Sequence, residues 1–394
     1  MDLGCSERGQ ALQKELERFL EDEVYPAEPE MAERRAAGKP YRDTVQRLQK
    51  VARSRGLWNL YLKSTNGLSN VDYGHLAELT GRSPDLAPAA INGAAPDSVN
   101  MVMLDAVASE EQRRMWLEPL LAGETRSAFA MTEPDVASSD ANNISTRIER
   151  DGDEYVITGR KWYISGAARP SCSVLFVMGV SNPDGDRHRR HSIVGVPIDT
   201  PGVEVLRPLP VFGYPGDPAE IEFRGARVPV EFRLGEEGMG FRVAQTRLAA
   251  ARLHHSMRLV GLAERALSLA ARRGGSRRIS GGALAANSVF RSQIAECRLA
   301  IDQARLMVLR AAWECDSTGQ RAAQTHISAA KIVATRTALA VLDRAVGIHG
   351  AMGVSEDSPM ARWWASARAL HIADGPEEVH LEVVARSELS SIGM

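Results

Sequence analysis

The spacing of hydrophobic positions changes along the chain. From residue 7 to 55 apolar side chains recur four residues apart, which predicts an amphipathic helix. The repeating positions are Leu12, Leu16, Leu20 and Val24. From about 126 to 234 the period shortens toward two, and Gly and Pro interrupt it at short intervals, as is typical of strands. After residue 235 long helical patterns return and predict a bundle.

These changes predict an α+β protein that is mostly α. We expect an N-terminal helical domain over 1–125, a central β-barrel or sandwich domain over 126–234, and a C-terminal four-helix bundle over 235–394. Strands are expected at 153–159, continued by 161–166, and at 174–180, 192–198, 203–209, 219–223 and 227–232, in a small antiparallel arrangement. Long helices are expected at 241–271, 289–315 and 325–348, and a last one from near 375 to 389.

Local signals predict one further helix and the buried face of another. Ser109 is followed three residues later by Gln112, which predicts a capping box, and Gly123 predicts the end of that helical region. For the helix over 289–315 a core stripe is expected, made of Ile294, Cys297, Leu299, Ala300, Ala304, Met307 and Val308.

Composition narrows the possible partners. The formal net charge of -2 and the scattered arginines argue against nucleic acid as the main partner. The four cysteines form no CxxC pair, so neither a metal site nor a disulfide framework is expected. The N-terminus lacks an apolar signal region and no run of 18 apolar residues occurs, so we expect a cytoplasmic protein without a membrane span.

The stretch from Phe129 to Gly166 joins the first helical block to the strands. Pro134 disfavours helix at Glu133, which predicts an ordered loop that enters the sheet. In a strand Trp162 and Tyr163 would point to opposite faces, and one of them could lie against a flat ligand. The alternative is that both are core aromatics.

Two motifs at this spacing, FAMTEPDVASSD and GRKWYISGA, resemble the flavin-binding β-domain of the acyl-CoA dehydrogenase family. The resemblance extends over roughly residues 10–390. It implies an FAD-dependent enzyme that oxidises an acyl thioester, bound to coenzyme A or to an acyl-carrier protein, between its α and β carbons. It also implies a homodimer or homotetramer that passes electrons to an electron-transfer flavoprotein.

The segment ADGPEEVH is similar to the DGPDEVH form of the segment that carries the family's catalytic base, so the resemblance assigns that role to Asp374. Read by itself, the segment is also a plain helix start, with Pro376 in the first turn. Some relatives draw the base from a long helix, at a position that matches Ala251, which has no basic group. Arg252 matches an arginine on the substrate side, and a surface ion pair is its alternative.

The resemblance also implies cofactor contacts. The matching residues are Phe129, Met131 and Thr132 beside the isoalloxazine, Tyr163 and Ser165 as an aromatic-x-hydroxyl pair, and Ser139 near the pyrophosphate or the thioester. Glu133 has no such role, and a solvated loop acid is expected there.

The adenosine side of the FAD site departs from the family pattern. Arg277 keeps the arginine of the family's Arg-x-x-Phe-Gly motif, but Ser280 stands where that motif has phenylalanine. Ser288 and Gly347 stand where glutamines are expected. Each lost contact would weaken binding by about 1 kcal/mol or more. Three hypotheses therefore stay open: a dehydrogenase with weaker adenine binding, an enzyme with redox-neutral thioester chemistry, and a non-catalytic binding homologue.

Overall fold

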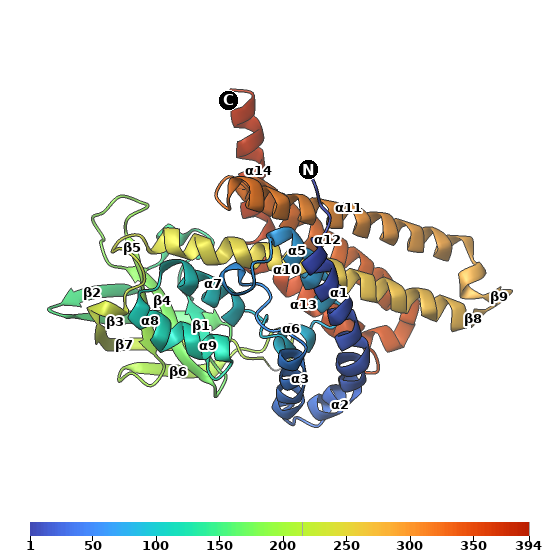
Figure 1. Ribbon diagram of the computed structural model, residues 1–394, viewed down its shortest axis with the longest axis horizontal. Coiled ribbons are helices and arrows are strands. Elements are labelled where there is room, and N and C mark those ends of the chain that lie inside the picture. The colour runs from blue at the N-terminus through green and yellow to red at the C-terminus, as the bar shows by residue number, and fades with distance from the viewer. Residues whose placement is uncertain (215, 394) are drawn as a thin grey trace. The chain divides into compact units, whose positions relative to one another are not determined.

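The computed structural model describes residues 1–214 and 216–393, and these fall into two compact units. The helical unit combines Met1–Gly93 with the chain from Ala251 onward, and the sheet unit is Ala94–Ala250. Figure 1 labels the elements of both. The finer division into domains at 1–125, 126–234 and 235–394 stays a prediction.

The first part of the helical unit is built from short helices. They are α1 (Glu7–Phe19), the π-helical turn η1 (Leu20–Val24), α2 (Tyr25–Ala36), α3 (Arg42–Ser54), α4 (Lys63–Asn66), α5 (Asn70–Gly81) and α6 (Ala87–Ala90). Leu16, Leu20 and Val24 are at most 1% exposed, so most of the apolar face expected from the sequence lies in the core.

The second part contains the long helices. Its elements are the part of α10 (Gly240–Ser276) from Ala251 onward, β8 (Arg278–Ile279), β9 (Gly282–Ala283), η5 (Leu284–Ala286), α11 (Ser288–Thr318), α12 (Gln324–His349), η6 (Gly350–Val354), α13 (Met360–Ile372) and α14 (Glu377–Ser391). Helix α12 packs against α11, α13 and α14. Helix α13 was not expected from the sequence, and it places Trp363 in the core, where the side chain is 3% exposed.

Two glycines allow α5 and α10 to cross at backbone distance. A Cβ atom built on Gly261 would lie 1.7 Å from the Glu78 carbonyl oxygen, and one on Gly81 would lie 2.0 Å from the Arg258 carbonyl oxygen. No residue with a side chain fits at such a spacing, because a Cβ contact below about 3 Å is a steric clash. Glycine at both positions therefore permits this crossing.

The core stripe expected on α11 is partly wrong. Cys297, Ala304 and Val308 are at most 3% exposed, but Leu299 is 62% exposed and Met307 is 37% exposed. Leu299 follows Cys297 by two positions, which is more than half a helical turn, so it lies on the opposite face of the helix.

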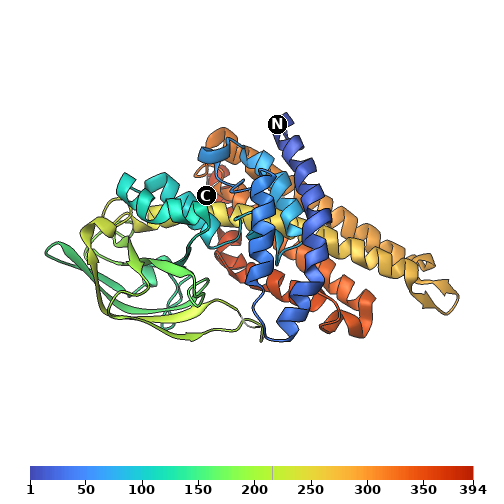
Figure 2. The ribbon, with the colours of Figure 1, turned by 60° about the horizontal axis from the view of Figure 1, so that its bottom comes forward.

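The sheet unit begins with helices and continues into a curled sheet (Figure 2). The helical elements are α7 (Asp97–Val107), α8 (Glu110–Gln112), η2 (Arg113–Leu117) and α9 (Glu118–Ala122). The capping box of Ser109 and Gln112 is confirmed, and Gly123 ends α9 at φ 71.

Seven strands form the main sheet. They are β1 (Arg126–Ala130), β2 (Arg147–Asp151), β3 (Glu154–Ile164), β4 (Cys172–Val180), β5 (His191–Pro197), β6 (Val203–Pro208) and β7 (Ala219–Pro229), with η3 (Ala141–Asn143) and η4 (Val230–Phe232) between or after them. The order is β1-β4-β2-β3-β7-β6, and β5 pairs with β4. The β1–β4 and β2–β4 pairings are parallel and the others antiparallel, so the sheet is mixed rather than wholly antiparallel.

The strands expected at 219–223 and 227–232 are one strand followed by a short helix. Strand β7 continues through Gly225 at φ 70, because its pairing with β3 resumes after a bulge. Residues 230–232 leave the ladder as η4. The apolar side of the sheet, with Tyr155, Ile157 and Phe223 at most 1% exposed, forms one core.

Residues 1–214 and 216–393 contain neither a candidate membrane span nor a candidate metal cluster. No helix there has the length and apolar content to cross a membrane. Within the same residues no group of three or more His, Cys, Asp or Glu could hold a metal ion.

Candidate active site

Glu133 is not a solvated loop acid, contrary to the expectation from the sequence. Its side chain is 3% exposed, and its Oε1 lies 2.9 Å from Nζ of Lys161, which is 0% exposed. Burial alone would raise the pKa of Glu133, but the Lys161 ammonium and hydrogen bonds from Thr146, Lys161 and Ser145 lower it below its ordinary value. Burial lowers the pKa of Lys161, against the attraction of Glu133.

This ion pair ties the loop after β1 to strand β3. Glu133 accepts hydrogen bonds from the backbone N–H and the hydroxyl of Ser145, at 2.8 and 2.7 Å, and from the Thr146 N–H at 2.8 Å. Lys161 also donates to the Met131 carbonyl at 2.9 Å. The predicted ordered loop therefore has a specific buried anchor.

The signal for this anchor was present in the sequence. Along β3 the buried side chains of Tyr155 and Ile157 have the same parity as Lys161, so alternation alone places the lysine on the inner face. A buried ammonium needs a carboxylate partner, and Glu133 stands in the loop that enters the same sheet.

The prediction that Trp162 and Tyr163 point to opposite faces is wrong. Pairing of β3 with β7 is interrupted between Lys161 and Ile164, and Tyr163 has a left-handed backbone with φ 51. The two rings are in edge contact, with centroids 5.0 Å apart. Tyr163 is 50% exposed, so it is not a core aromatic either, and its ring is accessible to a ligand.

Of the other residues assigned to the flavin, Met131 and Thr132 lie beside these two aromatics. Thr132 donates its hydroxyl to the Trp162 carbonyl at 2.6 Å and accepts from the Trp162 N–H at 3.0 Å, which places Met131 and Thr132 beside β3. Ser165 and Ser139 are exposed. Phe129, on β1, is 8% exposed and has the Arg247 guanidinium 4.5 Å from its ring centroid.

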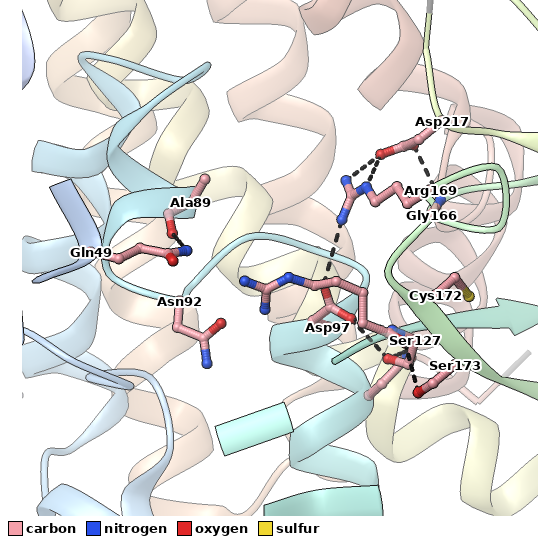
Figure 3. Close-up of polar contacts among 12 residues, drawn as sticks. Gln49, Ala89, Asn92, Asp97, Ser127, Gly166, Arg169, Cys172, Ser173 and Asp217 are labelled. Carbon is pink, nitrogen blue, oxygen red and sulfur yellow. Dashed lines mark hydrogen bonds and ion pairs between the residues drawn. The ribbon is translucent and has the colours of Figure 1, made fainter. Parts of the chain in front are cut away.

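A polar network supports the segment that follows Ser165 (Figure 3). Asp217 accepts from the Gly166 N–H at 3.1 Å and from the Arg169 guanidinium, which also reaches Asp97 at 3.5 Å. Asp97 accepts from the N–H and the hydroxyl of Ser127 at 2.7 and 2.9 Å. Burial raises the pKa of Asp97, and Arg126 and Arg169 oppose that shift.

The network continues through Asn100 to Arg247. Asn100 donates to the Ser127 hydroxyl at 2.9 Å and accepts from Nε of Arg247 at 2.7 Å. The turn at Gly166 and the cation over Phe129 are thus linked through a chain of buried and partly buried polar contacts.

In the helical unit Asp374 lies on the turn between α13 and α14. Its backbone is left-handed at φ 58, and Gly375 follows at φ 104. The carboxylate side chain is 15% exposed, and its Oδ2 lies 3.6 Å from Nε2 of His255 on α10. Asp374 is therefore a partly accessible carboxylate on a backbone of unusual conformation.

The Arg252 side chain contacts the backbone of this turn. It is 8% exposed, and its Nε donates to the Asp374 carbonyl at 2.8 Å. The alternative of a surface ion pair is therefore wrong. Burial lowers the pKa of Arg252, and the negative charge of Asp374 opposes the shift.

Lys331 on α12 holds the same turn and was not expected from the sequence. Its Nζ donates to the Ala373 carbonyl at 2.6 Å and also to the Gly375 carbonyl. The residue lies i+4 from Ile327 and i-4 from Thr335 on the buried face of α12, and this spacing was the available signal. Nearby, Nδ1 of His380 lies 3.1 Å from the hydroxyl oxygen of Ser328.

Residues assigned to the adenosine side lie elsewhere in the helical unit. Arg277 and Ser280 are exposed at the β8–β9 hairpin, where α10 and α11 meet (Figure 1), and Ser288 is exposed at the start of α11. Gly347 is exposed on α12, and a Cβ atom there would meet nothing within 4 Å. The structure brings Arg252 and Asp374 together but leaves these four at the surface of the chain.

Family models match almost the whole chain. The acyl-CoA dehydrogenase N-terminal domain matches residues 6–124, the middle domain 128–226 and the C-terminal domain 238–389. The chain is 48% identical to the probable acyl-CoA dehydrogenase FadE2 of Mycobacterium tuberculosis, over 99% of this chain and 97% of that protein. It is 44% identical to human acyl-CoA dehydrogenase family member 11, over 97% of this chain but only 50% of that longer protein.

Solved structures agree. The butyryl-CoA dehydrogenase of Megasphaera elsdenii has a TM-score of 0.85 and 26% identity, covering 99% of this chain and 100% of that one. An acyl-CoA dehydrogenase from Geobacillus kaustophilus has a TM-score of 0.83 and 26% identity, with 97% and 98% covered. The chain therefore belongs to the acyl-CoA dehydrogenase family, flavin-dependent oxidoreductases that act on CH–CH groups.

Proposed function

We propose that this protein oxidises an acyl thioester between its α and β carbons, with Asp374 as the base that removes the α proton. The observation that carries the proposal is the held carboxylate of Asp374: it is 15% exposed, on a turn whose carbonyls accept from Arg252 and Lys331. A base needs a fixed direction as well as access to substrate, and this turn offers both.

The α hydrogen of a thioester is a weak acid, so the carboxylate needs help. The negative charge that develops on the thioester oxygen must be met by N–H or O–H donors. The Asp374 N–H is one such donor, on the same residue as the base. Arg252, buried beside the turn, keeps its cation within reach of the acidic segment and is proposed to act on the substrate side.

The side chains around Tyr163 fit a flavin. Tyr163 presents a half-exposed ring, Thr132 and Ser165 present exposed hydroxyl-bearing side chains, and the loop is anchored by a buried ion pair. We assign the isoalloxazine to Phe129, Met131, Thr132, Tyr163 and Ser165, and the pyrophosphate or the thioester to Ser139. FAD, when bound, supplies the hydride acceptor, at N5, for the β hydrogen.

The adenosine side is proposed to be the weaker half of the site. Arg277 offers an exposed cation, whereas Ser280, Ser288 and Gly347 offer neither the aromatic ring nor the amides that the family pattern has there. In a homodimer or homotetramer these residues would serve the cofactor of a second copy. We propose a cytoplasmic enzyme whose substrate is an acyl-CoA or acyl-carrier protein and whose electron acceptor is an electron-transfer flavoprotein.

The test is an absorbance spectrum of the purified protein from 300 to 550 nm, before and after adding FAD, and then with an acyl-CoA in the absence of oxygen. Flavin bands that bleach in the wild type but not in Asp374→Asn would support the proposal. Exchange of the substrate α proton without bleaching would favour redox-neutral chemistry, which the missing adenosine contacts keep as the second candidate. No flavin even after added FAD would end the dehydrogenase proposal.

A further inference from the structure

Lys331 is a buried cation whose hydrogen bonds go to backbone carbonyls. The residue is 4% exposed, and its Nζ donates to the carbonyl oxygens of Ala373 and Gly375, on either side of Asp374. Removing an ammonium from water is costly unless its donors are satisfied. The long lysine side chain therefore reaches from α12 to the α13–α14 turn as a clamp across one residue.

This clamp sets the direction of the Asp374 N–H. In a trans peptide the C=O and the N–H point to opposite sides. Because the Ala373 carbonyl faces the Lys331 ammonium, the N–H of Asp374 in the same peptide unit is directed away from it. Nε of Arg252 donates to the Asp374 carbonyl at 2.8 Å. Three successive carbonyls of the turn, from residues 373 to 375, therefore accept hydrogen bonds from cationic side chains.

The clamp also holds a backbone that would not adopt this shape unaided. Asp374 has φ 58 and Gly375 has φ 104. A left-handed conformation at a non-glycine residue costs about 1 kcal/mol or more. Such a conformation persists only where the surroundings fix it, and here two buried cations do so.

We propose that Lys331 is a positioning residue for proton transfer, which holds the turn so that the Asp374 carboxylate and the Asp374 N–H face the acyl thioester together. The inference rests on the proposed role of Asp374 as the base. Lys331 itself touches no reacting atom. It acts by orienting one peptide unit and by polarising the N–H through the carbonyl at its other end.

Because Lys331 is titratable, the rate of proton transfer is expected to depend on pH. Burial lowers the pKa of Lys331 to about 8, against the attraction of Asp374. The other charged or titratable groups acting in this region are Arg252 and His255 on α10, His371 on α13, and Glu377 and His380 on α14. Above that pKa the amine loses its charge, so the rate of proton transfer should fall as pH rises through about 8.

The experiment compares four variants of the full FAD-loaded protein: Lys331→Met, Lys331→Arg, Asp374→Asn and, as a control, Arg336→Met. Arg336 is also a cation on α12 that reaches α14, but it bonds the Glu377 side chain rather than carbonyls beside Asp374. The rate of flavin bleaching at saturating acyl-CoA and the concentration for half-maximal rate are measured without oxygen from pH 6 to 10. Deuterium exchange of the backbone peptide over 373–380 is measured without ligand.

In Lys331→Met the maximal rate should drop about tenfold or more, with half-saturation changed by less than about threefold, because orientation rather than binding is lost. Amide exchange over 373–380 should rise. In Lys331→Arg the fall in rate near pH 8 should disappear, since a guanidinium stays charged. Arg336→Met should keep the wild-type rate and its alkaline fall.

Wild-type rates in Lys331→Met would overturn the inference, as would a loss that appears only in half-saturation. If Lys331→Met does not fold, the pH profile of Lys331→Arg decides: a retained fall near pH 8 overturns the proposal. Wild-type bleaching by Asp374→Asn would overturn the base assignment and this inference with it. An inert Asp374→Asn beside a fully active Lys331→Met would overturn only the inference.

Discussion

At the scale of single residues, the two lysines that sequence reasoning overlooked carry much of the local order. Lys161 and Lys331 are 0% and 4% exposed; Lys161 donates to the carbonyl of Met131, and Lys331 donates to the two carbonyls that flank Asp374. Lys161 has Glu133 as a partner, so the loop after β1 depends on a buried ion pair. Breaking such a pair on one side costs more than removing both charges.

Glu133→Gln should therefore destabilise the protein by about 3 kcal/mol. Lys161→Met added to it should recover part of that loss, which a double-mutant cycle of urea unfolding measures. Asp135→Asn is the control: this exposed acid in the same loop should change stability by no more than about 0.5 kcal/mol. A loss in Glu133→Gln no larger than in Asp135→Asn would contradict the prediction.

The same carboxylate predicts a pH dependence. The pKa of Glu133 is lowered from 4.5 to about 2, so its stabilising contribution is complete above pH 4.5 and is lost as pH falls through about 2. The free-energy difference between wild type and Glu133→Gln should shrink over that window. Unfolding by urea at a series of pH values measures it, and a difference that stays constant would show that folding does not lower the pKa of Glu133.

At the scale of elements, the backbone crossing of α5 and α10 gives the sharpest expectation. Gly261→Ala should destabilise the protein by about 2 kcal/mol or more, because its Cβ would lie 1.7 Å from the Glu78 carbonyl and the helices would have to separate. Gly275→Ala on the same helix is the control, since nothing lies within 4 Å of its Cβ. There the better helix propensity of alanine should leave stability equal or up to about 1 kcal/mol higher. Equal urea midpoints for the two variants would refute this account of the crossing.

Element-level patterns explain what the sequence could and could not provide. Helical period and capping residues located α8 and most of α10 to α12 within a few residues, because those signals are local. The parallel pairing of β1 with β4 and the bulge in β7 depend on partners distant in sequence. The left-handed backbones of Tyr163 and Asp374 likewise follow from tertiary bonds rather than from residue type.

At the scale of the whole molecule, the sequence reveals some residues of the candidate site and the structure reveals others. The motifs around Tyr163 and Asp374 are recognisable because a few residue types at fixed spacing recur in the family. Glu133 and Lys161 stand within those motifs and Lys331 stands outside them, but the supporting role of all three follows from burial and hydrogen bonds rather than from the motifs. A functional assignment from sequence thus finds the reacting groups before it finds their supports.

The adenosine side of the cofactor site can be tested by restoring what the chain lacks. Gly347→Gln should tighten FAD binding about fivefold or more, since one recovered hydrogen bond contributes about 1 kcal/mol. The substitution should fit, because a Cβ at Gly347 meets nothing within 4 Å.

The dissociation constant is measured by flavin fluorescence during titration of the apoprotein. Ser387→Gln serves as the control, since it places the same side chain at an exposed position of helix α14 to which no cofactor contact is assigned. If a second copy supplies this contact, the gain in Gly347→Gln should vanish on dilution below the dimer dissociation constant. An equal gain in both variants would mean that helix propensity, not a cofactor contact, is responsible. No gain in either variant would mean that this surface of α12 does not contact the cofactor. FAD would then be held mainly from the Tyr163 side of the site.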